Sequence, residues 1–218
     1  MAWSDPGDFT SGQILTAAQM DSVREAMFFG QATFTNEAAR DAAIPATGIA
    51  LQEGMRAYLT APTVPAATGG TTAVPSGVVT IYNGSAWVCV TPVHAFTSNT
   101  GTTTSGTYTA TLSGSPGTNP SVTLSTGTTA LVTHAALIKT NNTGQGAVQS
   151  VAVSGAGTVA ASDSWYIFNE ITNYVMCSFT SVITGLTAGN NTFTLQYRQG
   201  SATTTTVINR SLTVQGVA

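Results

Sequence analysis

The sequence predicts a mainly β protein, in which short N-terminal helices and a β-hairpin precede an antiparallel β-sandwich of the jelly-roll type. Thr, Ser, Gly, Asn and Ala dominate the composition; Thr favours strands, whereas Gly, Asn and Ser favour turns. Only 7% of the 218 residues are charged, against about 25% in an ordinary soluble domain. From about residue 96 onward, apolar runs and turn clusters alternate at short spacing, which is typical of a sandwich or jelly roll.

The first predicted helix spans residues 14–30. Thr16 can cap it, and Gln19 three residues later completes a capping box. Met20, Val23 and Met27 recur at helical spacing and form one apolar stripe. No long neighbouring helix is predicted that could cover this stripe, and methionine suits adaptable contacts. We therefore expect the stripe to contact another protein.

A second, shorter helix is predicted at residues 35–45, where Thr35 or Asn36 can cap the N-terminus. Residues 54–60 read as a strand. Residues 61–77 carry three prolines and three glycines without any charge, so we expect a linker or long loop. The Asn83–Gly84 pair between two apolar runs then predicts a β-hairpin with a type I′ turn.

Eight strands are expected in the remainder of the chain. They lie near residues 106–112, 120–125, 129–139, 147–153, 164–168, 174–183, 192–198 and 205–215. The predicted organisation is therefore an N-terminal helical segment at 1–60, a linker and hairpin at 61–95, and a jelly-roll knob at 96–218.

Several of these strands are apolar on both faces, most clearly "ALVTHAALI", "WYIF" and "YVMCSFTSVI". An antiparallel sheet normally exposes one face to water. A strand that is apolar on both sides needs a second covering layer, and another subunit can supply it. The pattern predicts a homo-oligomer.

The charged residues give little material for catalysis. After residue 56, Asp163 and Glu170 are the only carboxylates in the sequence, and we expect them at opposite ends of one strand, too far apart to flank a glycosidic bond. His94, His134, Cys89 and Cys177 match no zinc-ligand spacing. We therefore predict no enzyme, no catalytic residues, no metal site and no cofactor.

Partners of several classes are also disfavoured. A net charge of −3 with one lysine argues against a nucleic-acid partner. The sequence contains no run of 18 apolar residues, so we predict no insertion into a membrane. The first residues lack the basic and apolar regions of a secretory signal. We expect synthesis in a reducing cytosol, with both cysteines as free thiols.

Two features leave alternatives open. Arg210 shares its strand parity with Ile208 and Leu212, so it is expected at an interface, in a structural ion pair with Asp163 or Glu170, in a solvent-facing bulge or at a ligand. The aromatic side chains of the knob either fill its core or stack on sugars. These aromatic side chains are Trp165, Tyr166 and Tyr174.

The region from Gly12 to Val90 resembles a module of tailed-phage virion proteins, known in phages of actinobacteria as minor tail, tail-fibre or head-fibre proteins. The resemblance is carried by "GQILTAAQMDSVREAM", "ARDAAIP", "EGMRAYL" and "YNGSAW", with the uncharged Pro/Gly segment as an insertion before the hairpin. "ITGLTAGNNTFTLQYRQG" and the residues after it are similar to the last strands of trimeric jelly-roll fibre heads, which have a tumour-necrosis-factor-like fold.

This resemblance implies a structural virion protein: a fibre, spike or decoration protein. Its N-terminus would anchor it in the virion, and its C-terminal domain would form a trimeric knob. The implied partners are other virion proteins and a host-surface glycan. The alternatives are a carbohydrate-binding adhesion module and, less favoured, a polysaccharide depolymerase. The expected anchoring residues are Ile14, Leu15, Met20, Val23, Met27 and Phe28. The expected trimer-interface residues are Trp165, Tyr166, Ile167, Phe168 and Arg210.

Overall fold

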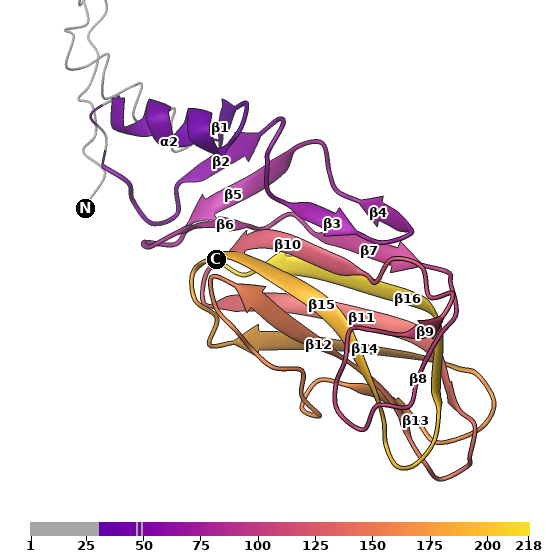
Figure 1. The fold of residues 1–218 in the computed structure, drawn as a ribbon. Helices are drawn as coiled ribbons and strands as arrows, with labels where there is room; N and C mark the ends of the chain where they lie inside the picture. The colour runs from indigo at the N-terminus through magenta and orange to yellow at the C-terminus, as the bar shows by residue number, and fades with distance from the viewer. Residues whose placement is uncertain (1–30, 47, 49) are drawn as a thin grey trace, which may run out of the picture.

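The computed structural model describes residues 31–46, 48 and 50–218, and shows a mainly β chain with an N-terminal sheet at one end of a β-sandwich (Figure 1). The predicted helix at 14–30 and all six expected anchoring residues lie outside the described residues. The anchoring role stays a prediction.

The N-terminal sheet contains four strands in the order β1-β2-β5-β6, with bounds Gln31–Phe34, Arg56–Leu59, Val78–Tyr82 and Trp87–Cys89. Helix α2, Glu37–Ala46, follows β1 and confirms the second predicted helix. Its cap is Asn36, whose Oδ1 accepts a hydrogen bond from the Ala39 N–H at 2.9 Å.

The predicted hairpin forms between β5 and β6, but its turn is not of type I′. The connection spans residues 83–86 and is closed by a hydrogen bond from Asn83 N to Ala86 O at 3.0 Å. Asn83 Oδ1 accepts hydrogen bonds from the backbone N–H of Ser85 and of Ala86. Only Gly84 of the Asn–Gly pair has positive φ, because the asparagine side chain stabilises a longer loop in which its own φ stays negative.

The segment at 61–77 is more than the expected linker or long loop. It contains β3, Ala66–Thr68, and β4, Thr71–Ala73, and these pair antiparallel with one strand in each sheet of the sandwich. Gly69, between the two strands, packs so closely that a Cβ would lie 2.8 Å from the Phe96 carbonyl oxygen. The three-part division of the chain stays a prediction.

The sandwich is a jelly roll of two antiparallel sheets. The five-stranded sheet has the order β13-β12-β15-β10-β3, in which the new strands span Ile167–Asn169, Ala147–Gly155, Gly189–Gln199 and Ser121–Thr126. The seven-stranded sheet follows the path β14-β11-β16-β7-β4, and its new strands span Val175–Thr184, Thr129–Thr140, Thr205–Gly216 and Val93–Thr97. Of its short strands, β8, Gly101–Thr103, pairs with β16, and β9, Ser113–Gly114, pairs with β8.

Six of the eight predicted knob strands are confirmed as β10, β11, β12, β14, β15 and β16. The strand expected at 164–168 is shorter and begins at Ile167. The strand expected at 106–112 is wrong, apart from a single bridge between Thr109 and Tyr197. Side-chain oxygens of Ser105 and Thr109 accept hydrogen bonds from the backbone N–H two residues onward, and such local bonds compete with a strand ladder.

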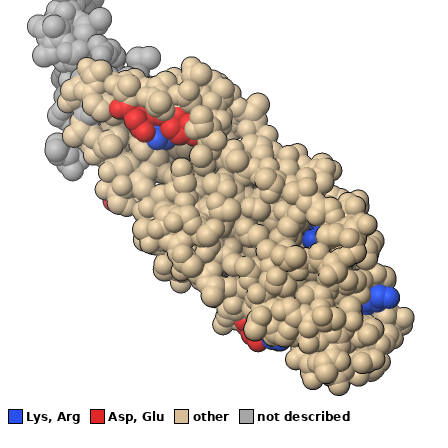
Figure 2. Space-filling model, in the orientation of Figure 1, with Lys and Arg blue, Asp and Glu red and all other residues tan. Residues whose placement is uncertain are grey.

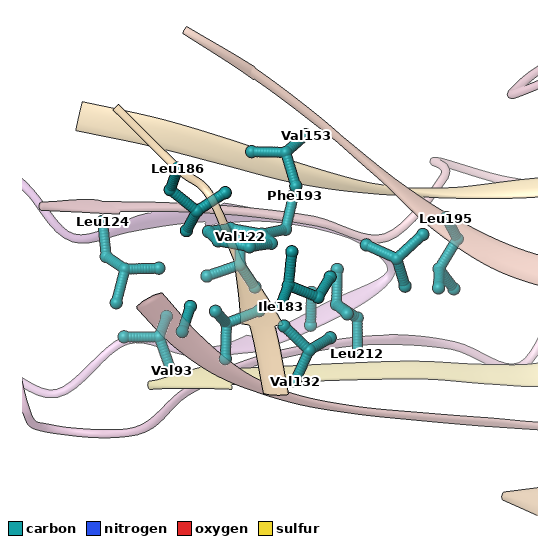
Figure 3. Close-up of a cluster of buried hydrophobic side chains, with 14 of the residues drawn as sticks. Val93, Val122, Leu124, Val132, Val153, Ile183, Leu186, Phe193, Leu195 and Leu212 are labelled. Atoms are coloured by element: carbon teal, nitrogen blue, oxygen red, sulfur yellow. The ribbon is translucent and has the colours of Figure 1, made fainter. Parts of the chain in front are cut away.

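The core fills the space between the two sheets (Figure 3). Phe193, Leu195 and Tyr197 of β15 are fully buried there, as their shared parity predicts. Leu59 and Cys89, from the N-terminal sheet, belong to the same buried cluster. The N-terminal sheet and the sandwich are therefore joined by a continuous hydrophobic core.

A β-bulge in β16 places Arg210 on the same face as Leu212, as expected, but not on the face of Ile208. The register with β11 moves from Ala135–Ser211 to Leu137–Ile208, so that Asn209 and Arg210 both lie opposite Ala136. Asn209 adopts a φ of 54°, which asparagine tolerates better than most residues. The extra residue turns Ile208 to the outer face and leaves Arg210 on the inner one.

Candidate interaction surfaces

The side chains considered for catalysis do not form a catalytic site. Asp163 Oδ2 lies 2.7 Å from Arg198 Nη2, and its Oδ1 accepts a 2.5 Å hydrogen bond from the Tyr108 hydroxyl. The hydrogen bond from Arg198 is the main reason that the pKa of Asp163 lies below its ordinary value. Asp163 is thus an ionised, fully engaged structural carboxylate, while Glu170 is exposed.

The histidines and cysteines are likewise dispersed. His94 Nδ1 lies 2.9 Å from Thr213 Oγ1, whereas His134 is buried beside Gln149. Cys89 and Cys177 are free thiols, as expected, and burial raises the pKa of Cys89 to about 11. Within the described ranges, no group of three or more His, Cys, Asp or Glu side chains is arranged to hold a metal ion.

Arg210 is fully buried inside the sandwich, so it is not on a surface that a second subunit could reach. Its Nη1 donates to Asn119 Oδ1 and to the Tyr197 hydroxyl, each at 3.2 Å, and its Nη2 donates to the Pro116 carbonyl. Neither Asp163 nor Glu170 pairs with it. The guanidinium therefore holds the loop before β10 against the core. The positions expected from the sequence, in an ion pair, in a solvent-facing bulge or at a subunit interface, are wrong for Arg210.

The other four expected interface residues alternate in exposure. Trp165 is half-buried and donates its Nε1–H to Val151 O at 3.0 Å, and Ile167 is buried. Tyr166 and Phe168 are 36% and 42% exposed, with their rings packed edge to face at 6.1 Å. Of the four residues of "WYIF", the structure therefore leaves the second and the fourth, Tyr166 and Phe168, exposed to a partner.

The exposed apolar side chains concentrate around the edge strands β13 and β14. Seven of the ten large hydrophobic side chains that are exposed in the described part of the chain lie between residues 166 and 182. Six of them form what we call the edge patch: Tyr166, Phe168, Ile171, Tyr174, Val175 and Met176. The two edge strands touch here, since Cys177 Sγ lies 3.6 Å from Phe168 O.

The apolar surface continues from the edge patch across the outer face of the seven-stranded sheet. Met176, 58% exposed, pairs in register with Leu137, which in turn pairs with Ile208. Farther along the same strands, Val182 is 57% exposed and pairs with Leu131. This is the second apolar side of the two-sided strands that the sequence predicted.

Few charged residues border these surfaces; they include Glu170, which is exposed between Phe168 and Ile171, and Lys139. Lys139 is the charged residue nearest to the edge patch along β11, and its Nζ lies 4.6 Å from the Tyr174 ring centroid. On the face of the molecule shown in Figure 2, charged side chains are sparse outside the N-terminal sheet. Among the described helices, none has the length and hydropathy to cross a bilayer.

No protein-family model and no curated protein sequence matches the chain. Solved structures with remote similarity include Eiger TNF from S. frugiperda, with a TM-score of 0.37 and 10% identity over 58% of this chain and 92% of that one. The xylan-binding CBM22-1 domain of Paenibacillus barcinonensis Xyn10C has a TM-score of 0.28 and 12% identity over 78% of this chain and 100% of that one.

A third, TmCBM61 in complex with β-1,4-galactotriose, has a TM-score of 0.28 and 12% identity over 56% of this chain and 68% of that one. Likenesses this remote carry no argument about function. The jelly-roll assignment rests on the strand order and pairing of the chain itself.

Proposed function

We propose that the protein is a structural component of a tailed-phage virion, a fibre, spike or decoration. In this proposal the N-terminus holds the protein in the particle, and the jelly roll assembles as a homotrimeric knob that adheres to the host surface. The phage assignment is supported by the motifs between Gly12 and Val90. The assembly is supported by one structural observation, the edge patch.

Soluble monomers seldom expose contiguous apolar patches larger than a few hundred Å². Here the exposed apolar side chains come from the edge strands of both sheets, so the patch lies where the sandwich is open at its side. A further copy packed on this edge would cover the apolar side chains and the unpaired strand edges together. Because the six side chains of the patch are all uncharged, a second apolar surface of the same kind fits it.

The number of copies comes from the resemblance to trimeric fibre heads. Three copies around an axis bury the edge patch in a closed ring, with roughly 1,000 Å² or more lost to solvent for each stable contact. Assembly and adhesion need no catalytic centre, which agrees with the engagement of Asp163 by Arg198 and Tyr108.

Light scattering on the full-length protein tests the assembly. We expect a trimer at micromolar concentration, and we expect M176K to dissociate it because a lysine would have to be desolvated at the contact. V74K is the matched control. Val74 is an exposed apolar residue directly after β4, and it lies outside the edge patch. A wild-type monomer, or an M176K trimer as stable as the wild type, contradicts the proposal.

The virion role has its own test. Imaging of intact particles with a label on the C-terminus should place the knob on the capsid, the neck or the tail. Charged substitutions at Met20, Val23 and Met27 should abolish incorporation into particles without changing the melting temperature of the knob. Particles that lack the label altogether would refute the virion assignment.

A further inference from the structure

A groove of about 450 Å³ crosses the outer face of the five-stranded sheet. This volume falls in the range of small-ligand sites, roughly 300–1,000 Å³. Strands β12 and β15 form its floor, and the loop after β12 forms one wall. The residues that line it are Tyr108, Ala152, Val153, Ser154, Thr158, Val159, Ala160, Ala161, Thr194 and Gln196.

The floor offers hydroxyl and amide groups at regular spacing. Thr194 is in register with Ala152, and Gln196 is two residues farther along β15 on the same face. The small side chain of Ala152 leaves room above the sheet. In the described part of the chain, the side chains of Ser154, Thr158 and Gln196 have no hydrogen-bond partner, so their polar atoms are available to a ligand.

The wall is held by the backbone. Val153 and Val159 exchange two hydrogen bonds, 2.8 Å and 2.9 Å long, which fold the loop back along the edge of β12. Ser150 Oγ donates to Ser162 O at 2.9 Å and ties down the far end of the same loop. The groove is therefore formed before any ligand binds, which lowers the entropic cost of binding.

Tyr108 provides an aromatic surface at one side of the groove. Its hydroxyl donates to Asp163 Oδ1 at 2.5 Å, and the Arg198 guanidinium lies 5.2 Å from its ring centroid. These contacts fix the ring orientation, and burial raises the pKa of Tyr108, so the hydroxyl stays protonated. A rigid ring of this kind can stack against the C–H face of a sugar.

The charge of the site selects the class of ligand. No lining residue is ionisable except Tyr108, and the nearby Asp163 and Arg198 neutralise each other at 2.7 Å. An anion would find no free cation, and a cation would find no free carboxylate. An uncharged ligand with many hydroxyl groups and one apolar face fits the hydroxyls, the amide and the ring.

We propose that this groove binds a neutral oligosaccharide. The inference rests on the adhesive role proposed above and locates it in the five-stranded sheet, on strands other than those that carry most of the edge patch. Ser154, Thr194 and Gln196 hydrogen-bond the sugar hydroxyls, and Tyr108 stacks on a sugar ring.

Calorimetric titration of the full-length protein tests the groove with three neutral probes, cellohexaose, xylohexaose and mannohexaose, and one acidic probe, trigalacturonate. We expect at least one neutral probe to bind with a dissociation constant of about 1 mM or lower. Q196A and T194V should each weaken that binding roughly three- to tenfold, because each removes a hydrogen bond to the ligand. Y108L should abolish it.

T206V is the matched control, because Thr206 is a half-buried residue on the outer face of the other sheet. It should bind as the wild type does, and melting curves should show that Q196A and T194V remain folded. The inference is overturned if no neutral probe binds, if the acidic probe binds best, or if Q196A and T194V bind normally.

Light scattering on the same samples separates this inference from the proposed function. A trimer that binds no sugar defeats the groove alone. A monomer that binds sugar through Gln196 and Thr194 supports the groove and defeats the trimeric knob.

Discussion

The guanidinium carbon of Arg40 lies 4.5 Å from the centroid of the Trp87 ring. Both side chains are buried, and they belong to "ARDAAIP" in α2 and to "YNGSAW" at the hairpin. Arg40 also bonds Asp41 Oδ1 at 2.8 Å and Thr80 Oγ1 at 3.4 Å. The two sequence pieces that carry the resemblance to phage proteins are thus parts of one packed contact.

This contact yields the first prediction. R40A should lower the free energy of unfolding by about 2–4 kcal/mol, because it removes a desolvated cation–π contact and leaves Thr80 and Trp87 underpacked. D41N is the control: Asp41 is 56% exposed, so its ion pair is worth less than about 1 kcal/mol. Urea unfolding measures both variants. Equal losses for the two would show that the stacking on Trp87 contributes little.

The second prediction concerns a fragment that begins at Thr91. The sequence suggests that such a fragment stays folded and soluble, but the structure places Leu59, Val78 and Cys89 in the core of the sandwich. The cut also removes β3 and β4, which cover the edges of β10 and β7. We expect a clearly lower melting temperature than that of the full chain, together with aggregation. A fragment with an unchanged melting temperature would show instead that the knob folds independently of the N-terminal sheet.

The third prediction tests the bulge in β16. Asn209 has a φ of 54°, a region that costs a β-branched residue about 1–2 kcal/mol or more. N209V should therefore destabilise the protein by that amount, whereas N209G should stay within about 0.5 kcal/mol of the wild type. Chemical denaturation measures the difference. If valine were tolerated as well as glycine, the strand would have to run without the bulge.

The fourth prediction is a dependence of stability on pH. Burial lowers the pKa of His134 to about 4, from an ordinary value of 6.5. Because the folded-state pKa lies below the unfolded one, the unfolded chain binds more protons between these values, and stability falls as the pH drops through this window. We expect a loss of about 2 kcal/mol between pH 7 and pH 5.

Urea unfolding at the two pH values measures this loss, and H134L is the control. The leucine variant lacks the titrating group, so its stability should change much less over the same range. An equal loss in H134L would assign the effect to other groups in the chain.

Part of the candidate surfaces could be predicted from sequence. The two-sided apolar pattern of "YVMCSFTSVI" predicts a face that needs a cover, and Met176 and Val182 are exposed on it. The groove gives no such signal. Tyr108, Ser154 and Gln196 are far apart in the chain, and only the pairing of β12 with β15 and the path of the loop before β9 bring them to one place.

The sequence by itself determined the strand faces and most strand positions, because side chains alternate across a strand with a fixed period of two. Phe193, Leu195 and Tyr197 share the inner face for that reason alone. Only the tertiary structure decided that residues 66–73 complete both sheets, and that Arg210 points into the core. Pairing between distant segments leaves no local pattern, and one left-handed residue at Asn209 reverses the parity of every residue on one side of it.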